Sequence, residues 1–454
     1  MNRRSLAFLL TIAAASPAVV GADDRALDLA IGDPARKDAH AAVVLDGITD
    51  ARTADVITPA ELAARLDGVR LLFVGESHTN DDFHQAQLRV IQELHKRGRQ
   101  VLIGLEMYPA SEQEWLERWF AEKEMTEDAF VAQSRWYKNW GYHWNYYSGI
   151  FAFAHANGIR MFGVNAPRTL VQTVRMKGFE ALTAEQRAYL PERIDLDSEE
   201  HKQLFRAFFS SADALHGSMP DEMFQTMFRA QCTWDAAMGW NALQALKKHG
   251  GEKAIMVVLI GSGHVAYGLG AERQTKLWFD GRIASLVPIP VADAERETVV
   301  TKVRASYADF VWGLPPETDP LYPTLGVSTP EQKSGERFKV IAVAKDSVGA
   351  AAGFAVGDEL VSLDGVPIVD KETTNRLMSL KRWGDAAEYK VMRGGQEVTL
   401  TAHFRRNPPQ AAGIAKPAEA AAPAEAAKPA MPAMPGMPAM PPAAAKPPKT
   451  ERPE

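Results

Sequence analysis

The chain has 454 residues, of which 46% are apolar and 24% charged, and its formal net charge at pH 7 is -6. This balance argues against nucleic acid as a partner, and the length is sufficient for more than one hydrophobic core. The single cysteine, Cys232, excludes an internal disulfide, and we expect it to be a small buried side chain rather than a nucleophile.

The N-terminal segment is typical of a secretory signal peptide. Arg3 and Arg4 precede an apolar stretch, residues 6–15, that is too short to cross a bilayer, and small residues at 20–22 form a cleavage pattern. Cys232 lies too far from this segment to be the acylated cysteine of a lipoprotein. We therefore expect residues 1–22 to be removed and the mature protein to be exported, soluble, without a transmembrane helix, and periplasmic or secreted.

Residues 40–300 have the pattern of an α/β domain. Apolar, β-branched stretches alternate with segments long enough for helices, and the clearest of these stretches are "RLLFVG", "QVLIGLE", "IRMFGVN" and "AIMVVLIG". This alternation predicts a mainly parallel open sheet with helices on both faces.

The composition changes after this domain. Short strands and turns in residues 322–405 predict a separate small β-rich domain, and residues 301–321 are expected to link the two. Residues 406–454 are rich in Ala, Pro and Lys, which predicts a disordered tail.

Methionines recur every third residue in this tail, at Met431, Met434, Met437 and Met440. A polyproline II helix has three residues per turn, so the four thioethers would share one face and would suit Cu(I). The simpler interpretation, a low-complexity linker without a copper-binding role, is the one that we favour.

Polar residues follow all four apolar stretches of the α/β domain. The carboxyl ends of parallel strands lie along one edge of a sheet, so we expect these residues to meet in one crevice. Each group by itself is equally consistent with an ordinary turn, whereas the four together indicate a site. They are Gly75-Glu76-Ser77-His78, Glu106, Asn165-Ala166-Pro167-Arg168 and Gly261-Ser262-Gly263-His264.

The residue types indicate the chemistry of such a site. Two imidazoles and two carboxylates suit a first-row divalent metal or general acid–base catalysis near neutral pH, and Arg168 would bind a carboxylate or a developing oxyanion. His84 is either an additional ligand or a surface residue at the start of a helix. Asp235 is either a buried acceptor for one of the histidines or a polar residue on a solvated face, and we favour the buried acceptor.

An aromatic segment, residues 135–147, lies between the second and third apolar stretches and contains seven of the twenty Trp and Tyr residues. Its rings either cover the mouth of the domain, stack on a flat ligand or pack against the sheet. The residues are Trp136, Tyr137, Trp140, Tyr142, Trp144, Tyr146 and Tyr147.

Five ordered stretches resemble the ChaN-type haem-binding uptake domain of the Tiki superfamily, over about residues 42–295. They are "GESHTNDDFHQAQLRVIQEL", "GLEMY", "YYSGIFAFAHANGIRMFGVNAPR", "AQCTWDAAMG" and "IGSGHVAYGLG". The superfamily also includes metal-dependent proteases and erythromycin esterases, which share two Gly-x-x-His motifs, a glutamate and an arginine. By matching motif, the resemblance carries these functional residues to His78 with Glu76, His264, Glu106 and Arg168.

The resemblance implies haem as the cofactor, bound through a tyrosine in a homodimer that holds two haems face to face. Tyr147 matches the tyrosine-rich helix start of the family best, Tyr146 and Tyr267 are the alternatives, and Trp144 is a further expected haem contact. The lack of an acylated cysteine departs from the usual membrane-anchored form of the family and puts an uptake role at the outer membrane in doubt.

Residues 322–405 resemble a bacterial PDZ domain of the kind attached to periplasmic proteases. The resemblance is carried by Ser347, by Gly353 and Gly357-Asp358, and by Leu363-Asp364-Gly365. Such a domain adds the C-terminal strand of a partner protein to a sheet edge and holds its carboxylate on backbone amides, for which Leu325-Gly326-Val327 is the candidate loop. A PDZ fold kept only as a spacer is the alternative.

Three functions follow as hypotheses. The first is an exported haem- or metalloporphyrin-binding protein in iron or haem handling, with a PDZ module that recruits a partner. The second is a metal-dependent esterase or protease that holds Mn, Co or Zn through His78, His264, Glu76, Glu106 and His84. The third is a scaffold whose first domain is catalytically idle.

Overall fold

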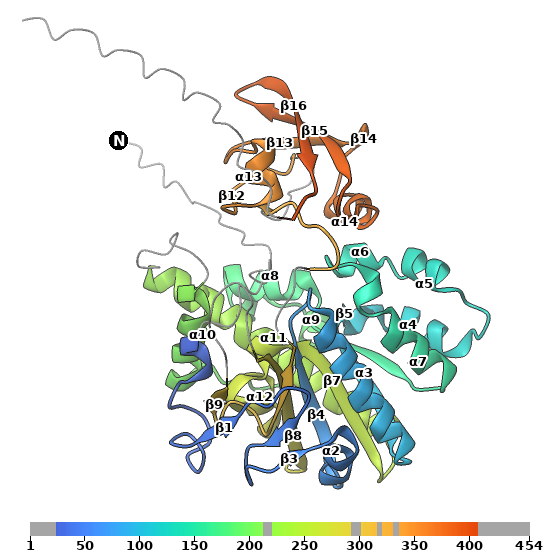
Figure 1. Ribbon diagram of the computed structural model, residues 1–454, viewed down its shortest axis with the longest axis vertical. Coiled ribbons are helices and arrows are strands. Elements are labelled where there is room, and N and C mark those ends of the chain that lie inside the picture. The colour runs from blue at the N-terminus through green and yellow to red at the C-terminus, as the bar shows by residue number, and fades with distance from the viewer. Residues whose placement is uncertain (1–23, 212–219, 292–300, 316–319, 330–335, 407–454) are drawn as a thin grey trace, which may run out of the picture. The chain divides into compact units, whose positions relative to one another are not determined.

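The computed structural model describes residues 24–211, 220–291, 301–315, 320–329 and 336–406 (Figure 1). The signal peptide and the methionine-rich tail expected from the sequence lie outside these residues. Within the described ranges, no helix combines the length and the apolar composition that crossing a membrane requires.

The first domain is built on an eight-stranded sheet with the strand order β3-β2-β10-β8-β4-β7-β5-β6. All neighbours from β10 to β6 are parallel, whereas β2 pairs antiparallel with β10 and with β3. The predicted, mainly parallel open sheet is therefore confirmed. The strands are β2 (Ile48–Asp50), β3 (Val56–Ile57), β4 (Val69–Glu76), β5 (Gln100–Pro109), β6 (Met161–Asn165), β7 (Ala254–Gly261), β8 (Arg282–Pro290) and β10 (Phe310–Leu314), and a separate ribbon pairs β1 (His40–Ala42) with β9 (Lys302–Arg304).

Helices cover both faces of this sheet (Figure 1). One face packs against α2 (Pro59–Arg65), α3 (Asp81–Lys96), α4 (Gln113–Ala121), α5 (Glu127–Gln133), α6 (Trp136–Asn139), η2 (Trp144–Tyr146) and α7 (Ser148–Ala156). The other side of the domain carries α1 (Asp24–Leu27), α8 (Arg168–Lys177), α10 (Glu199–Ser211), α11 (Asp221–His249) and α12 (Ala271–Lys276). The remaining short helices are η1 (Ala110–Glu112), η3 (Phe179–Ala181), α9 (Ala184–Arg187), η4 (Ser262–His264) and η5 (Ala266–Gly268).

Alternation along the strands assigns side chains to the two faces. In β4, Leu72 and Val74 belong to the core under α3 and α7, while Leu71 and Phe73 belong to the core under α11. The same alternation operates in β5 and β7, because successive side chains of a strand point to opposite faces. It decides where the polar residues at the strand ends lie.

The boundary of the first domain differs from the sequence prediction. Residues 301–321 were expected to be a linker, but β9 and β10 lie within this range, and β10 is an internal strand between β2 and β8. All five residues of β10 are buried, which is the pattern of a strand covered on both faces. A stretch of five apolar residues is too short to be recognised as a central strand without its neighbours, so the sequence pattern missed it.

The second domain contains a four-stranded antiparallel sheet and a two-stranded ribbon. The sheet has the order β14 (Val366–Pro367), β13 (Glu359–Leu363), β15 (Ala386–Arg393) and β16 (Gln396–His403), and the ribbon pairs β11 (Val327–Ser328) with β12 (Ala342–Val343). Two helices, α13 (Val348–Ala352) and α14 (Lys371–Ser379), complete it. Its apolar core is separate from those of the first domain, as expected for a small β-rich domain.

Candidate functional site

The polar residues at the ends of β4, β5 and β7 come together at the carboxyl edge of the sheet. Ligand atoms of Glu76, His78 and Glu106 all lie within 4.8 Å of one another. The Nε2 atom of His264 is 3.7 Å from Oε1 of Glu106. We call these four residues the edge cluster. It is largely covered, since only the His264 side chain, 15% exposed, is more than one-tenth accessible.

Glu76 is the buried centre of one half of the edge cluster. It follows Leu72 and Val74 in the alternation of β4 and therefore points to the face covered by α3. Its Oε1 lies 2.6 Å from Nδ1 of His78 and accepts a hydrogen bond of 2.9 Å from the Tyr147 hydroxyl. Oε2 accepts from the side-chain amide of Gln87 at 3.2 Å and lies 3.4 Å from Nδ1 of His84.

These contacts keep Glu76 ionised. Burial by itself raises the pKa of the carboxyl, but His84 and His78 outweigh it and hold the pKa well below its ordinary value. An ionised carboxylate only accepts hydrogen bonds, so Nδ1 of His78 carries the proton. Both oxygens of Glu76 thus contact side chains of this chain, and Glu76 supports the ring of His78.

His84 is not the surface residue that was one of its two interpretations from the sequence. It is 1% exposed in the first turn of α3, where Nδ1 faces Glu76 and Nε2 lies 3.4 Å from the carbonyl of His78. Its ring therefore supports the buried carboxylate. As a metal ligand it remains a prediction, and metal binding would require His84 to give up these contacts.

Glu106 occupies the other half of the edge cluster. In β5 it alternates with Leu105 and Met107, which face α3, and so points toward the side of α11. Its Oε2 accepts a hydrogen bond of 2.6 Å from the backbone N–H of Gly261. A methyl group at Gly261 would lie 3.6 Å from Nε2 of His78 and 3.6 Å from Oε2 of Glu106, which places those two atoms on the same side of the glycine.

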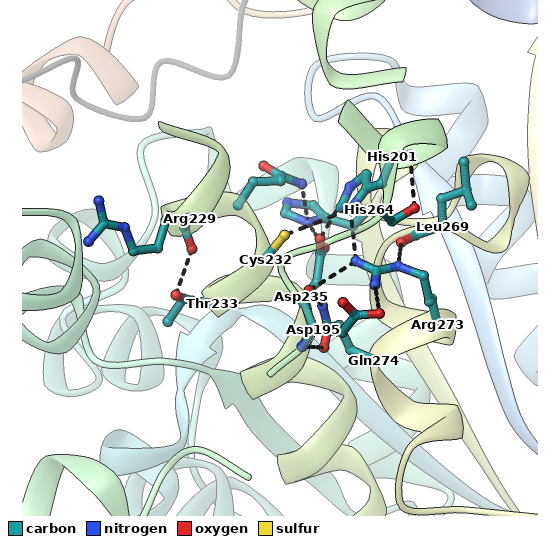
Figure 2. A network of polar contacts seen from close by, with 12 residues as sticks. Asp195, His201, Arg229, Cys232, Thr233, Asp235, His264, Leu269, Arg273 and Gln274 are labelled. Atoms are coloured by element: carbon teal, nitrogen blue, oxygen red, sulfur yellow. Dashed lines mark hydrogen bonds and ion pairs between the residues drawn. The ribbon is translucent and has the colours of Figure 1, made fainter. Parts of the chain in front are cut away.

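His264 follows β7 and is held by Asp235 (Figure 2). Its Nδ1 lies 2.6 Å from Oδ1 of Asp235, which is fully buried in the middle of α11. The favoured interpretation of Asp235 as a buried acceptor is thereby confirmed. Burial lowers the pKa of His264, but the carboxylates of Asp235 and Glu106 outweigh burial and raise the pKa above its ordinary value. The carboxylates of Glu76 and Glu106 likewise raise the pKa of His78 against the effect of burial.

No motif or spacing in the sequence indicated the residues behind Asp235. His201 of α10 is 1% exposed and places Nε2 3.6 Å from Oδ2 of Asp235. Arg273 of α12 donates to Nδ1 of His201 at 3.2 Å and is itself bound by Asp195 at 2.5 Å (Figure 2). Neither His201 nor Arg273 belongs to a spaced motif, and only the packing of α10, α11 and α12 brings them together.

Arg168 lies at the first position of α8, directly after β6. Its guanidinium donates a hydrogen bond of 2.8 Å to the carbonyl of Asn139 in the aromatic segment. Asn165, at the end of β6, donates to the carbonyl of Glu106 at 2.9 Å. The residues after β6 therefore contact the same strand end as the edge cluster, and an anion-binding role of Arg168 remains a prediction.

The three candidate tyrosines have different environments. Tyr147 is fully buried, donates to Glu76 and accepts from Nε1 of Trp140 at 3.1 Å. Burial and the neighbouring Glu76 raise its pKa well above the ordinary value. Burial likewise raises the pKa of Tyr146 to about 12. Iron ligation by Tyr147 remains a prediction, and it would require the hydroxyl to leave Glu76.

Tyr267 is not brought to the edge cluster. Its hydroxyl donates to the carbonyl of Ala26 at 2.8 Å and accepts from the N–H of Leu29 at 2.9 Å. It holds the N-terminal segment against the domain and adopts a left-handed backbone with φ of 61°. Of the three tyrosines, Tyr147 is the one whose hydroxyl donates to Glu76.

The aromatic segment combines two of the alternatives considered from the sequence. Trp136 and Trp144 belong to the apolar core of the domain, and Nε1 of Trp144 donates to Glu127 at 3.1 Å. Trp140 and Tyr142 are half-buried and cover His78, with ring centroids 4.9 and 4.8 Å from the imidazole. Part of the segment is therefore packing, and part covers the edge cluster.

In the second domain, Leu325-Gly326-Val327 leads into β11. Gly326 has φ of 72°, and a methyl group there would lie 2.3 Å from Cβ of Ser347, so the position requires glycine. The carbonyl of Leu325 accepts a hydrogen bond of 2.7 Å from the N–H of Gly349. The loop is thus anchored to the start of α13, and its binding of a peptide carboxylate remains a prediction.

We expect His201 to make the stability of the first domain sensitive to acid. Burial, opposed by Asp235, lowers the pKa of His201 from 6.5 to about 4. Between these values the unfolded chain binds more protons than the folded chain. Lowering the pH from 7 to 5 is therefore expected to lower the free energy of unfolding by about 2 kcal/mol.

The measurement is urea unfolding of the wild type and of His201→Gln at pH 7 and pH 5. His78 and His264, whose pKa values are raised, act in the opposite direction in both proteins, so the difference between the two proteins isolates His201. An equal loss on acidification in both would contradict the prediction.

Comparison with known proteins supports the resemblance. Residues 62–274 match the family model described as haem-binding uptake, Tiki superfamily, ChaN, and residues 323–403 match the model of the PDZ domain. The chain carries a ChaN-type domain of the Tiki superfamily, followed by a PDZ domain.

A curated relative is the chloroplastic protein RETICULATA-RELATED 5 of Arabidopsis thaliana, 26% identical over 263 residues, which are 55% of this chain and 34% of the relative. The chain thus spans about a third of the length of that relative. A structure of ChaN of Campylobacter jejuni, described as showing cofacial haem binding, is 17% identical, covers 58% of this chain and 95% of its own, and has a TM-score of 0.46.

Two further structures resemble separate parts of the chain. A mutant of the erythromycin esterase EreC in an open conformation is 12% identical, covers 62% of this chain and 98% of its own, and has a TM-score of 0.36. The HtrA-type protease AlgW with a decapeptide is 27% identical, covers 19% of this chain and 30% of its own, and has a TM-score of 0.18.

Proposed function

We propose that the ChaN-type domain binds haem or another metalloporphyrin at the edge cluster, and that the protein acts in iron or haem handling. The observation that carries this proposal is the pair of imidazoles, His78 and His264. Each has its Nδ1 held by a carboxylate 2.6 Å away, which leaves both Nε2 atoms on the side of Glu106. The match of the domain to the ChaN family model supports haem as the ligand.

The neighbouring aromatic rings suit a flat ligand. Trp140 and Tyr142 are half-buried against His78, and aromatic side chains of this kind stack on planar groups. A porphyrin would displace or stack on these two rings, with His264 or Tyr147 as the iron ligand. As in ChaN of Campylobacter jejuni, whose structure shows cofacial haem binding, two copies of this chain would hold haems face to face.

We further propose that residues 1–22 direct export to the periplasm or beyond, and that the PDZ domain recruits a partner protein by its C-terminus. The anchored loop Leu325-Gly326-Val327, whose last residue begins β11, is the site that would receive the terminal carboxylate. Secretion of a reporter fused to residues 1–30 tests the first part. Binding of random C-terminal peptides by the full chain, lost in Gly326→Val, tests the second.

The test of haem binding is a hemin titration of residues 23–454, followed by absorption. We expect a saturable Soret shift, together with dimer formation in sedimentation velocity. The variants are Tyr147→Phe and His264→Ala, with Tyr267→Phe as the matched control because its hydroxyl serves only the N-terminal segment.

The variants assign the iron ligand. A tyrosinate charge-transfer band that disappears only in Tyr147→Phe assigns Tyr147, whereas a changed Soret position only in His264→Ala assigns His264. Unsaturable binding of hemin by the wild type would contradict the proposal.

A second candidate function, a metal-dependent hydrolase, is favoured by one observation: donor atoms of Glu76, His78 and Glu106 lie within 4.8 Å of one another. Carboxylate oxygens and imidazole nitrogens at such separations suit Mn, Co or Zn, which could activate water for ester or peptide hydrolysis. Chelator-treated protein would be incubated with each chloride salt, gel-filtered and assayed for bound metal. One equivalent of metal without hemin binding would favour the hydrolase.

A further inference from the structure

We propose that Asp235 is a positioning residue that fixes the tautomer of His264 and so directs its Nε2 lone pair to the edge cluster, as Glu76 does for His78. The ligand role of that nitrogen rests on the proposed function, whereas its tautomer can be measured without any ligand.

The contact between the two side chains determines which atom carries the proton. Nδ1 of His264 lies 2.6 Å from Oδ1 of Asp235 and 2.9 Å from the side-chain amide nitrogen of Gln231. A ring nitrogen offers either one hydrogen or one lone pair, so it cannot serve both neighbours. The shorter contact, to a carboxylate, is the stronger one and makes Nδ1 a donor. Nε2 then carries the lone pair.

The residues behind Asp235 lead to the same arrangement from the opposite side (Figure 2). Arginine only donates hydrogen bonds, so Nδ1 of His201, 3.2 Å from Arg273, must accept. The proton of His201 therefore sits on Nε2, which faces Oδ2 of Asp235 at 3.6 Å. His201 thus directs its N–H toward Oδ2 of Asp235 from beyond hydrogen-bond distance, while Oδ1 accepts the hydrogen bond of His264.

Arg273 is itself held in one orientation. It binds Oδ2 of Asp195 at 2.5 Å and the carbonyl of Asp195 at 3.2 Å, and its Nε donates to the carbonyl of Leu269 at 2.8 Å. The imidazole of His201 therefore meets a fixed donor. This chain of contacts connects a loop outside α11 to the nitrogen that faces Glu106.

The backbone around the pair leaves little room for another geometry. A methyl group at Gly270 would lie 2.3 Å from the carbonyl oxygen of His264 and 3.1 Å from Oδ1 of Asp235. Oδ2 of Asp235 has no hydrogen-bond partner among the described residues, although the side chain is completely buried. Such an atom is costly to bury, which a role in orienting His264 explains and a purely apolar core position does not.

Glu76 and Asp235 are equivalent in this respect. Each carboxylate lies 2.6 Å from Nδ1 of the histidine in a Gly-x-x-His motif at the end of a strand. The two carboxylates approach their histidines from opposite faces of the sheet. Carboxylate–imidazole pairs of this kind set the tautomer and basicity of a ligand nitrogen. Loss of Asp235 should therefore affect His264 and leave His78 unchanged.

The test compares imidazole nitrogen resonances of ligand-free wild type and Asp235→Asn at pH 8, by long-range proton–nitrogen correlation. His264→Gln and His78→Gln identify the two signals. We expect the proton on Nδ1 for both rings in the wild type, and on Nε2 of His264 alone in Asp235→Asn. A proton on Nε2 of His264 in the wild type would overturn the proposal even if the variant failed to fold.

The second readout is the hemin dissociation constant. We expect a weakening of about 10–100-fold in Asp235→Asn, with partial recovery in Asp235→Glu. We expect no comparable change in the control Asn241→Asp, at a position of the same helix whose side chain donates to the carbonyl of Val164. If the tautomer changed in Asp235→Asn but neither the wild type nor any variant bound hemin, the proposed haem function would be refuted and the positioning role of Asp235 would be supported. An unchanged tautomer in Asp235→Asn would refute the positioning role.

Discussion

Replacement of Glu76 by alanine is expected to lower the free energy of unfolding of the first domain by about 3–5 kcal/mol. The carboxylate is 2% exposed and has four side-chain neighbours: His78, His84, Gln87 and Tyr147. Its removal leaves their donors buried without a partner, and it leaves any positive charge on the two histidines without compensation. The measurement is urea unfolding followed by tryptophan fluorescence and by circular dichroism.

Two controls separate the loss of charge from the loss of contacts. Glu76→Gln keeps an acceptor oxygen at the same place and should lose less stability than Glu76→Ala. Glu114→Ala removes an exposed carboxylate of α4 and should change the free energy of unfolding by at most about 0.5 kcal/mol. A change below 1 kcal/mol in Glu76→Ala would mean that the buried contacts described here do not hold the domain together.

Replacement of Trp136 by alanine is expected to cost about 3–5 kcal/mol as well, for a different reason. Its side chain is fully buried, packs against Trp144 and Tyr147 with ring centroids 4.9 and 5.3 Å away, and donates from Nε1 to the carbonyl of Tyr142 at 2.9 Å. The substitution leaves a large cavity and an unpaired carbonyl in the segment that covers the edge cluster. Unfolding in urea again measures the loss.

Tyr142→Ala is the matched variant within the same segment. Its ring is half-buried and covers His78, so its removal should lower stability by about 1 kcal/mol or less and should weaken hemin binding more than it weakens the fold. The pair of variants distinguishes the rings that pack from the rings that would contact a ligand. If Tyr142→Ala were the more destabilising change, this division of the aromatic segment would be wrong.

The sequence predicted the sheet well where the apolar stretches were long. The stretches ending near Gly75, Leu105, Val164 and Ile260 became β4, β5, β6 and β7, and their polar ends meet because the strands are parallel neighbours. Strand β10 was missed because five apolar residues in a region of changing composition have no periodicity of their own. Its assignment depends on contacts with β8 and with β2, and β2 lies far away in the sequence.

The candidate site was predictable in membership but not in arrangement. The motifs identified His78, His264, Glu76 and Glu106, yet only the register of β4 and β5 shows that the two carboxylates point to opposite faces. The positions of His84 and His201 follow from helix packing, which no spacing in the sequence reveals. The hydroxyl of Tyr267 bonds an N-terminal segment more than two hundred residues away, a contact that motif matching cannot anticipate.

Strand β10 also sets the point in synthesis at which the first domain can finish folding. Until Leu314 has left the ribosome, β8 keeps an open edge and β2 has only β3 beside it in the large sheet. A nascent chain that ends at residue 274, where the ChaN match ends, lacks β8 as well and leaves β4 uncovered on one side. Open parallel edges invite aggregation. A gene fragment intended to express the ChaN-type domain by itself must therefore extend through Leu314.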